Sequence, residues 1–154
     1  MRATLDEQCV ITASDQFWQQ MLSMNLDTLP TADQFCVGSG HILGAVDLSG
    51  VWRGRIEVRL APGLATCATA AMLMLPEDAV AEADTLDAIK EIANMIAGVI
   101  KSSLPRPCSM AVPQSAVEPR GYCSPPRTPD TLSVAFRHSA GDLLVRIWEQ
   151  EYVV

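Results

Sequence analysis

Five residues between positions 87 and 101 recur at helical spacing, and two of them carry side chains suited to chemistry. Asp87, Glu91, Asn94, Gly98 and Lys101 follow at steps of four, three, four and three, so on a helix they share one face. The carboxylate of Glu91 and the carboxamide of Asn94 then stand one turn apart, where they can form hydrogen bonds to a bound molecule. Gly98 in the next turn has no side chain, so another molecule could dock closely there.

The same stripe also has a plainer interpretation. The polar side of an amphipathic helix is usually just a solvated surface. Gly98 argues for more than solvation, because Gly in a helix interior costs on the order of 1 kcal/mol relative to Ala and usually has a packing or contact reason. The pattern alone leaves both interpretations open.

The element that positions this stripe is predicted to be a helix over residues 84–104. Asp84 is a candidate N-cap, with Asp87 in the first turn, where a carboxylate suits the helix dipole. The apolar residues recur mostly at steps of three and four, as on a helix that buries one side. They are Leu86, Ile89, Ile92, Ala93, Ile96, Val99, Ile100 and Leu104.

The chain before this helix predicts two further helices and three strands. Ser14 can cap a helix over residues 15–26, which Pro30 and Thr31 end. Three runs then read as strands, over residues 35–37, 41–48 and 52–60, with Gly-containing turns between them. The run LATCATAAMLML, residues 64–75, predicts a buried helix closed by Pro76, with its methionines filling the core.

The chain after the long helix is rich in proline and ends in a hairpin. Seven of the ten prolines lie between Pro105 and Pro129. A short strand is predicted over residues 109–112, ending at Pro113, and residues 121–130 are predicted to be only a loop. Residues 132–138 and 143–148 form the predicted hairpin.

This order of elements predicts a single α+β domain over residues 1–154. Strands joined by short turns favour antiparallel pairing, and the helices need a sheet face to cover. Each half of the chain has helix followed by three strands. We therefore expect helices packed on an antiparallel β-sheet, in two helix-plus-three-strand halves.

Composition limits the classes of partner. The 154 residues are 49% hydrophobic and 19% charged, with a formal net charge of −7. An acidic chain without a Lys/Arg cluster argues against nucleic acid and against anionic membranes as main partners. No apolar run is long enough to span a bilayer, and no signal peptide is apparent, so we expect a cytoplasmic protein.

The cysteines and histidines give no metal-ligand pattern. Five cysteines are widely spaced without a Cys-x-x-Cys pair, and the two histidines lie in different segments. We therefore expect reduced thiols that mostly pack in the core, and no metal site. A thiol-based sensor that uses Cys108 or Cys123 is a minor alternative that rests on composition alone.

The long helix and its surroundings resemble the CheC/CheX/FliY family of chemotaxis phosphatases. The family motif has an acidic residue or Ser, three intervening residues, Glu, two intervening residues, Asn, and a Pro further on. Asp87, Glu91 and Asn94 match this spacing, followed by MIAGVIKSSLP. The preceding DLSGVWRGRIEVRLAPGLATCATAAMLM is also similar, so the resemblance covers roughly residues 35–115. A single Glu-Asn motif makes the chain resemble CheX more than CheC. We assign the motif Pro to Pro113 rather than Pro119.

The resemblance implies dephosphorylation of a CheY-like response regulator. Asn94 has no useful basicity but could hold a water in line with phosphorus, and positioning is most of what phosphoryl transfer needs. Glu91 would pair with a cation of the regulator, while Asp87, Gly98 and Lys101 would border the docked partner. The chain would need no cofactor of its own, because Mg²⁺ would sit on the partner receiver domain. The alternative is a non-catalytic module that docks a receiver or another signalling protein.

The resemblance to CheX also implies a homodimer. In the C-terminal run LLVRIWEQEYVV, both faces of an extended strand carry apolar residues: Leu144, Arg146, Trp148, Gln150 and Tyr152 on one, and Leu143, Val145, Ile147, Glu149 and Glu151 on the other. Helices could cover one face and a second copy the other. The alternative is a central strand of a monomer.

Overall fold

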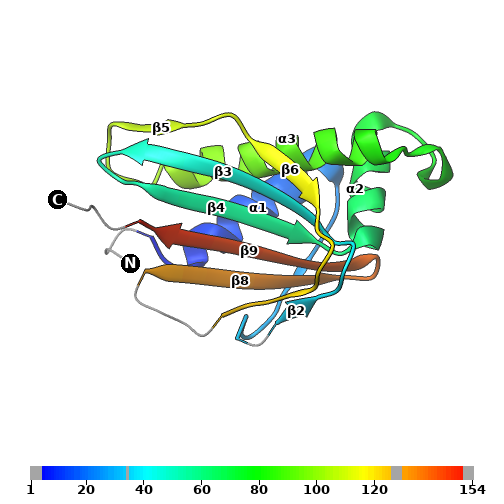
Figure 1. Ribbon diagram of the computed structural model, residues 1–154, viewed down its shortest axis with the longest axis horizontal. Coiled ribbons are helices and arrows are strands. Elements are labelled where there is room, and N and C mark those ends of the chain that lie inside the picture. The colour runs from blue at the N-terminus through cyan, green and yellow to red at the C-terminus, as the bar shows by residue number, and fades with distance from the viewer. Residues whose placement is uncertain (1–4, 34, 126–129, 151–154) are drawn as a thin grey trace.

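Three helices cover one face of an antiparallel sheet (Figure 1). The computed structural model describes residues 5–33, 35–125 and 130–150. The helices are α1 (Glu7–Leu22), α2 (Pro62–Leu73) and α3 (Glu82–Lys101), and a short 3-10 helix, η1 (Glu77–Ala79), joins α2 to α3. This architecture confirms the predicted α+β class.

The sheet is built around the β3–β4 and β8–β9 hairpins. Seven strands are arranged in the order β1-β8-β9-β4-β3-β5, with β6 also paired to β3, and β2 and β7 form a separate two-stranded ribbon. All these pairings are antiparallel. The strands are β1 (Asp27–Thr28), β2 (Cys36–Val37), β3 (Ile42–Gly50), β4 (Gly54–Leu60), β5 (Cys108–Met110), β6 (Gln114–Val117), β7 (Tyr122–Cys123), β8 (Thr131–His138) and β9 (Gly141–Glu149). The six predicted strands are all found, whereas β1, β6 and β7 are additional.

Strand register directs one apolar face toward the helices. Val46 of β3 lies opposite Ile56 of β4, which in turn lies opposite Ile147 of β9. Residues with the same orientation on β4, β8 and β9 belong to the main core cluster. Ile56, Val58 and Leu60 of β4 point toward this core and are fully buried. Burying such a side chain contributes about 2 kcal/mol, so this face is what holds the helices to the sheet.

The first helix begins earlier than predicted. α1 starts at Glu7, because the Asp6 carboxylate accepts the backbone N–H of Cys9 and caps the first turn. Ser14, the predicted cap, is buried inside the helix. The helix ends at Leu22, and Ser23 adopts a left-handed conformation there. The prediction of residues 15–26 therefore placed both ends too far along the chain.

The second helix is less buried than its composition suggested. α2 spans Pro62–Leu73 rather than residues 64–75, and it buries one side only. Leu73, Met74 and Leu75 are exposed, and Met74 is 92% exposed. The prediction that the methionines fill the core is wrong for Met74, although Met72 packs against the core. In the described residues, no helix is both long enough and apolar enough to cross a bilayer.

The boundaries of α3 and of the proline-rich segment also differ from prediction. α3 begins at Glu82 and ends at Lys101. Asp84 is not the N-cap but lies inside the first turn, where its carboxylate accepts the backbone N–H of Ala81. Residues 121–130, predicted to be only a loop, contain the short strand β7. Residues 126–129 lie outside the described residues, as do Glu151 and Tyr152 of the C-terminal run.

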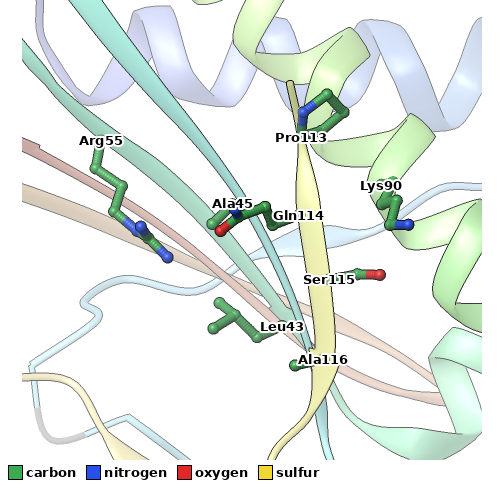
Figure 2. Close-up of a pocket in the computed structure, with 8 residues that line it drawn as sticks. All are labelled: Leu43, Ala45, Arg55, Lys90, Pro113, Gln114, Ser115 and Ala116. Atoms are coloured by element: carbon green, nitrogen blue, oxygen red, sulfur yellow. The ribbon is translucent and has the colours of Figure 1, made fainter. Parts of the chain in front are cut away.

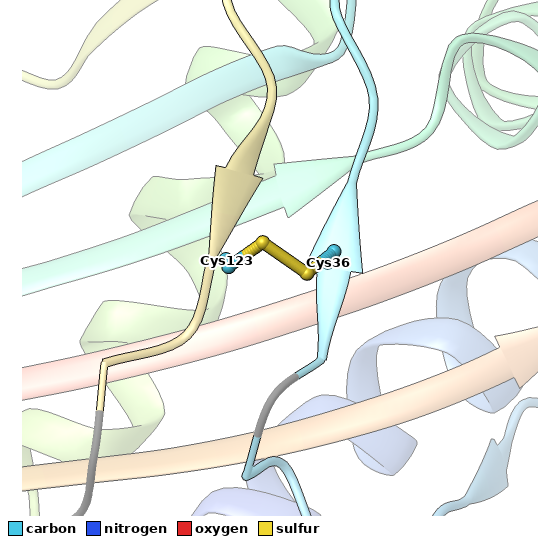
Figure 3. The surroundings of a disulfide bond; sticks show 2 residues. All are labelled: Cys36 and Cys123. Atoms are coloured by element: carbon cyan, nitrogen blue, oxygen red, sulfur yellow. A yellow bond between two sulfur atoms is a disulfide. The ribbon is translucent and has the colours of Figure 1, made fainter.

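The expectation of five reduced cysteines is wrong for one pair. Cys36 of β2 and Cys123 of β7 form a disulfide between exposed, directly opposed residues (Figure 3). Cys9, Cys67 and Cys108 form no disulfide with another described residue. Cys108 is buried in the main core and half-buried Cys9 packs against it, so the prediction of core packing holds for these two and not for Cys67. Spacing along the sequence does not reveal the pair, because its members are 87 positions apart.

Candidate functional site

Helix α3 is fixed on the sheet by its apolar side. Ile89, Ile92 and Ile96 are fully buried in the main core. Gly44 of β3 allows this close packing, because a Cβ atom at that position would lie 2.8 Å from the Ile89 Cγ2 atom and 2.9 Å from the Ile89 carbonyl oxygen. A rigid scaffold of this kind keeps the opposite side of α3 in one orientation.

A hydrogen bond from the sheet edge adds a second attachment for α3. The Ser115 hydroxyl on β6 donates to the Leu86 carbonyl oxygen at 2.7 Å. Leu86 lies in the early part of α3, directly before Asp87 and five residues before Glu91. The sequence did not predict this contact, because β6 was not recognised as a strand.

All five predicted site residues lie on α3, away from its buried side. Asp87, Glu91 and Gly98 are exposed, and Asn94 and Lys101 are half-buried. The stripe inferred from spacing is therefore present in the fold. The Asp87 carboxylate forms an ion pair within the helix, at 3.9 Å from the Lys90 ammonium.

The two chemically suited side chains are available to a partner. In the described parts of the chain, neither the Glu91 carboxylate nor the Asn94 carboxamide has a hydrogen bond or ion pair with another side chain. A carboxylate and a carboxamide one turn apart, unengaged and on a rigid helix, can bind a cation and orient a water. The described residues contain no group of three or more His, Cys, Asp or Glu that could hold a metal ion.

A groove beside the stripe was not predicted. It measures about 400 Å³ and lies where β6 passes α3 (Figure 2). Ser115 points from β6 toward the helix, and Lys90 contributes the cation on the α3 side. Pro113, which we assigned to the family motif, lies at one end of this groove. Pro113 lies between β5 and β6 at the open edge of the sheet. Proline has no backbone N–H to donate, and at this position the strand pairing does not need one.

A second polar cluster lies on the sheet face that points away from the helices. Buried Glu57 forms ion pairs with Arg55, Arg59 and Arg146. Arg59 also donates to Nε2 of buried His41 at 2.9 Å, and its guanidinium lies 3.8 Å from the centre of the Tyr122 ring. These contacts connect the β2–β7 ribbon to the sheet, and they do not involve α3.

Part of the sequence that includes α3 matches the model of a known protein family. The family model described as chemotaxis phosphatase CheX matches residues 42–136, which include β3 to β6 and all of α3. None of the curated proteins matches the chain.

Several solved structures share the fold. CheX from Vibrio vulnificus has a TM-score of 0.76 and 18% identity, over 97% of this chain and 100% of that one. A CheC-like superfamily protein from Shewanella sp. PV-4 has a TM-score of 0.77 and 16% identity, over 98% and 100%. A chain of the CheX–CheY–BeF3–Mg²⁺ complex from Borrelia burgdorferi has a TM-score of 0.70 and 17% identity, over 94% and 97%.

At these identities the structures establish the fold, whereas the family match rests on the sequence itself. That match covers more than half of the chain and contains both Glu91 and Asn94. The chain therefore belongs to the CheX family of chemotaxis phosphatases.

Proposed function

We propose that this protein stimulates hydrolysis of the aspartyl phosphate on a CheY-like response regulator. The observation that carries the proposal is the exposed, unengaged pair of Glu91 and Asn94 on a helix fixed to the sheet, inside the segment that matches the family. A CheX protein from Borrelia burgdorferi has been solved together with CheY. A receiver-domain partner would place the protein in the cytoplasm.

In this proposal, Asn94 orients the attacking water. A carboxamide cannot remove a proton near neutral pH, but its oxygen and N–H₂ group can hold a water in line with the phosphorus. Holding the water in place converts an encounter with solvent into a prearranged attack. Asn94 is half-buried, so its carboxamide remains accessible to a water at the surface of α3.

Glu91 fixes the register of the complex. Its exposed carboxylate pairs with a cation of the regulator, one turn from Asn94. The Mg²⁺ ion and the phosphorylated aspartate both belong to the receiver, where the metal neutralises charge on the transferring group. The roles of this chain are therefore docking and water positioning, without a cofactor of its own.

Phosphate release from phosphorylated receivers, measured with and without the protein, tests the proposal. We expect faster release in its presence at substoichiometric concentration. The alternative, a non-catalytic module that docks the receiver, predicts binding with an unchanged or longer phosphate lifetime.

We also propose a homodimer, formed through the β6 edge. β9 cannot be the interface assumed from the sequence, because it lies in the centre of the sheet between β8 and β4. Its two apolar faces pack inside this chain: Ile147 joins the main core, and Leu144 packs with Ala135 and Ala32 on the other side. Among the described strands β6 pairs with β3 alone, so it lies at the sheet edge, where unpaired backbone groups favour addition of another strand.

Sedimentation equilibrium over a wide concentration range tests the dimer. A two-fold pairing of edges repeats one patch on each subunit and would leave both α3 stripes accessible. Replacing Val117 of β6 with Pro removes a backbone N–H that points away from β3, because the N–H of the neighbouring Glu118 donates to His41 beside β3, and we expect the variant to shift toward the monomer mass. A monomer at every concentration for the unmodified protein contradicts the proposal.

A further inference from the structure

A hollow continues the polar stripe of α3 beyond Asn94. We call it the Gly98 hollow; it measures about 490 Å³ and is lined by Gly98, Lys101, Ser102, Arg106, Pro107 and Cys108. Gly98 leaves its helix side open, because a Cβ atom there would meet nothing within 4 Å. Packing against the core therefore does not explain a glycine in the middle of this helix. The explanation that remains is that the glycine keeps the space in front of the helix open.

The charged groups of the hollow are both cations. Lys101 is half-buried and Arg106 is exposed, and in the described residues neither has an acidic partner. Most other described cations are paired with carboxylates of this chain. The Lys101 ammonium is close enough to Cys108 to lower the pKa of its thiol, although burial outweighs this and leaves the pKa raised. A positive hollow stands out on a protein with a net charge of −7.

The end of α3 does not offset this positive charge with open carbonyl groups. Three of its last carbonyl oxygens accept backbone N–H groups from the following turn: those of Val99, Ile100 and Lys101. Unpaired carbonyls are the source of the negative pole of a helix. These three oxygens therefore present less open negative charge beside the ammonium and guanidinium groups than unpaired carbonyls would.

The wall opposite the helix is fixed. The Pro107 carbonyl oxygen accepts the backbone N–H of Val51 at 2.9 Å, and Cys108 pairs in register with Gly50. Gly50 has a φ of +133°, and a Cβ atom there would overlap the Pro107 carbonyl. The β3–β4 turn thus holds residues 107–108 in place. A preformed cavity costs less ordering when a partner binds.

We propose that the Gly98 hollow receives an acidic side chain of the phosphorylated receiver, as a second docking contact beside Glu91 and Asn94. This inference rests on the proposed function and adds the chemistry of the contact. Lys101 lies seven residues after Asn94, about 10 Å along the helix axis. The receiver carboxylate therefore lies roughly that far from the phosphoryl group. Glu91 presents a negative charge and the hollow a positive one, so together they fix one orientation of the receiver.

Two kinds of variant test the contact. Gly98→Leu fills the hollow without a clash in the folded chain and should fold normally, which thermal melting checks. Lys101→Ser combined with Arg106→Ser removes its charge. We expect each to raise the half-saturating concentration of phosphorylated receiver about tenfold with an unchanged maximal rate. The salt dependence of half-saturation should also flatten in the charge variant. Ala71→Leu, at an exposed position of α2, is the matched control.

The readouts separate this inference from the proposed function. Affinity for the phosphorylated receiver and the rate of phosphate release are measured on the same samples. Failure of the unmodified protein to accelerate release contradicts the proposed function, and the affinities then still decide whether the hollow binds. Unchanged affinity in both variants overturns the hollow alone. A lower maximal rate with unchanged half-saturation also overturns it, because the hollow would then shape the reacting site. If the unmodified protein binds no receiver at all, the occupant of the Gly98 hollow is not a receiver side chain and the inference is wrong.

Discussion

Asn94 and Glu91 are neighbours on α3 but differ in chemistry, so their loss should have different effects. Both lie on the solvent side of α3, one turn apart, and neither is held by another side chain in the described residues. Only the carboxamide can both donate and accept at a water, and only the carboxylate carries a charge. The two residues are therefore separable by kinetics.

Asn94→Ala should remove most phosphatase activity and leave the fold intact. We expect the rate of receiver dephosphorylation to fall roughly 100-fold or more, because a misplaced water costs about that much. The residue lies outside the core, so the free energy of unfolding should change by less than about 0.5 kcal/mol. Receiver-phosphate lifetime and thermal melting are measured together. Activity equal to that of the unmodified protein would rule out the assigned role of Asn94.

Glu91→Ala should act mainly on recognition. We expect a higher half-saturating concentration of phosphorylated receiver and a weaker salt dependence, because an ion pair across an interface contributes to encounter and register. Titrations at two salt concentrations measure both quantities. Asp87→Ala is the comparison variant, because it removes the same charge one turn away on α3. A lower maximal rate at unchanged half-saturation would instead indicate that Glu91 shapes the water site.

The residue pattern was predictable, whereas the contacts that position it were not. Spacing alone identified the stripe, because the helical period is a local property. Gly44 and Ser115 hold α3 through β3 and β6, which lie far from it in the sequence. Such contacts depend on strand register, and a single sequence does not reveal register before the pairing is known.

At the scale of elements, β3 and α3 depend on one close contact. Gly44→Ala should destabilise the protein by on the order of 1 to 2 kcal/mol, because the new methyl group would lie within 3 Å of the Ile89 backbone and force α3 to shift. Chemical denaturation measures this change. Gly38→Ala is the control, since a Cβ atom at position 38 meets nothing within 4 Å. Equal stabilities of the two variants would contradict the close packing of α3 on β3.

The long helix and the longer strands were predicted from their apolar patterns. Very short strands were missed, and the ends of helices were misplaced. β3, β4, β8 and β9 are longer, largely apolar runs bounded by turn residues and were found, whereas the two-residue strands β1 and β7 are too short to show any pattern. The start of α1 was missed because Asp6 and Ser14 are both good caps, and burial of Ser14 decided between them. The Cys36–Cys123 pair could not be deduced, because five cysteines allow many pairings.

At the scale of the whole molecule, the disulfide connects the two halves of the chain. Closing a loop over 87 positions restricts the unfolded chain, and the chain-entropy relation gives about 4.6 kcal/mol of added stability. Cys36→Ser should therefore lower the free energy of unfolding by roughly 2 to 4 kcal/mol under oxidising conditions. Urea denaturation measures it. A dithiol reductant should weaken the unmodified protein and leave the variant unchanged; equal effects on both would mean that the disulfide does not form.

The same disulfide also determines how the protein responds to proteolysis. The segment between Cys36 and Cys123 contains β3, β4, α2, α3, β5 and β6, so the entire candidate site lies within one covalent ring. A cut at the exposed η1 corner, residues 77–79, would open this ring without separating the two fragments. The nicked chain would run at full size on a non-reducing gel and as two pieces after reduction. The core would still hold α2 and α3 together, and the disulfide would keep the two fragments joined. The nicked protein would therefore keep its docking face as long as the disulfide is intact.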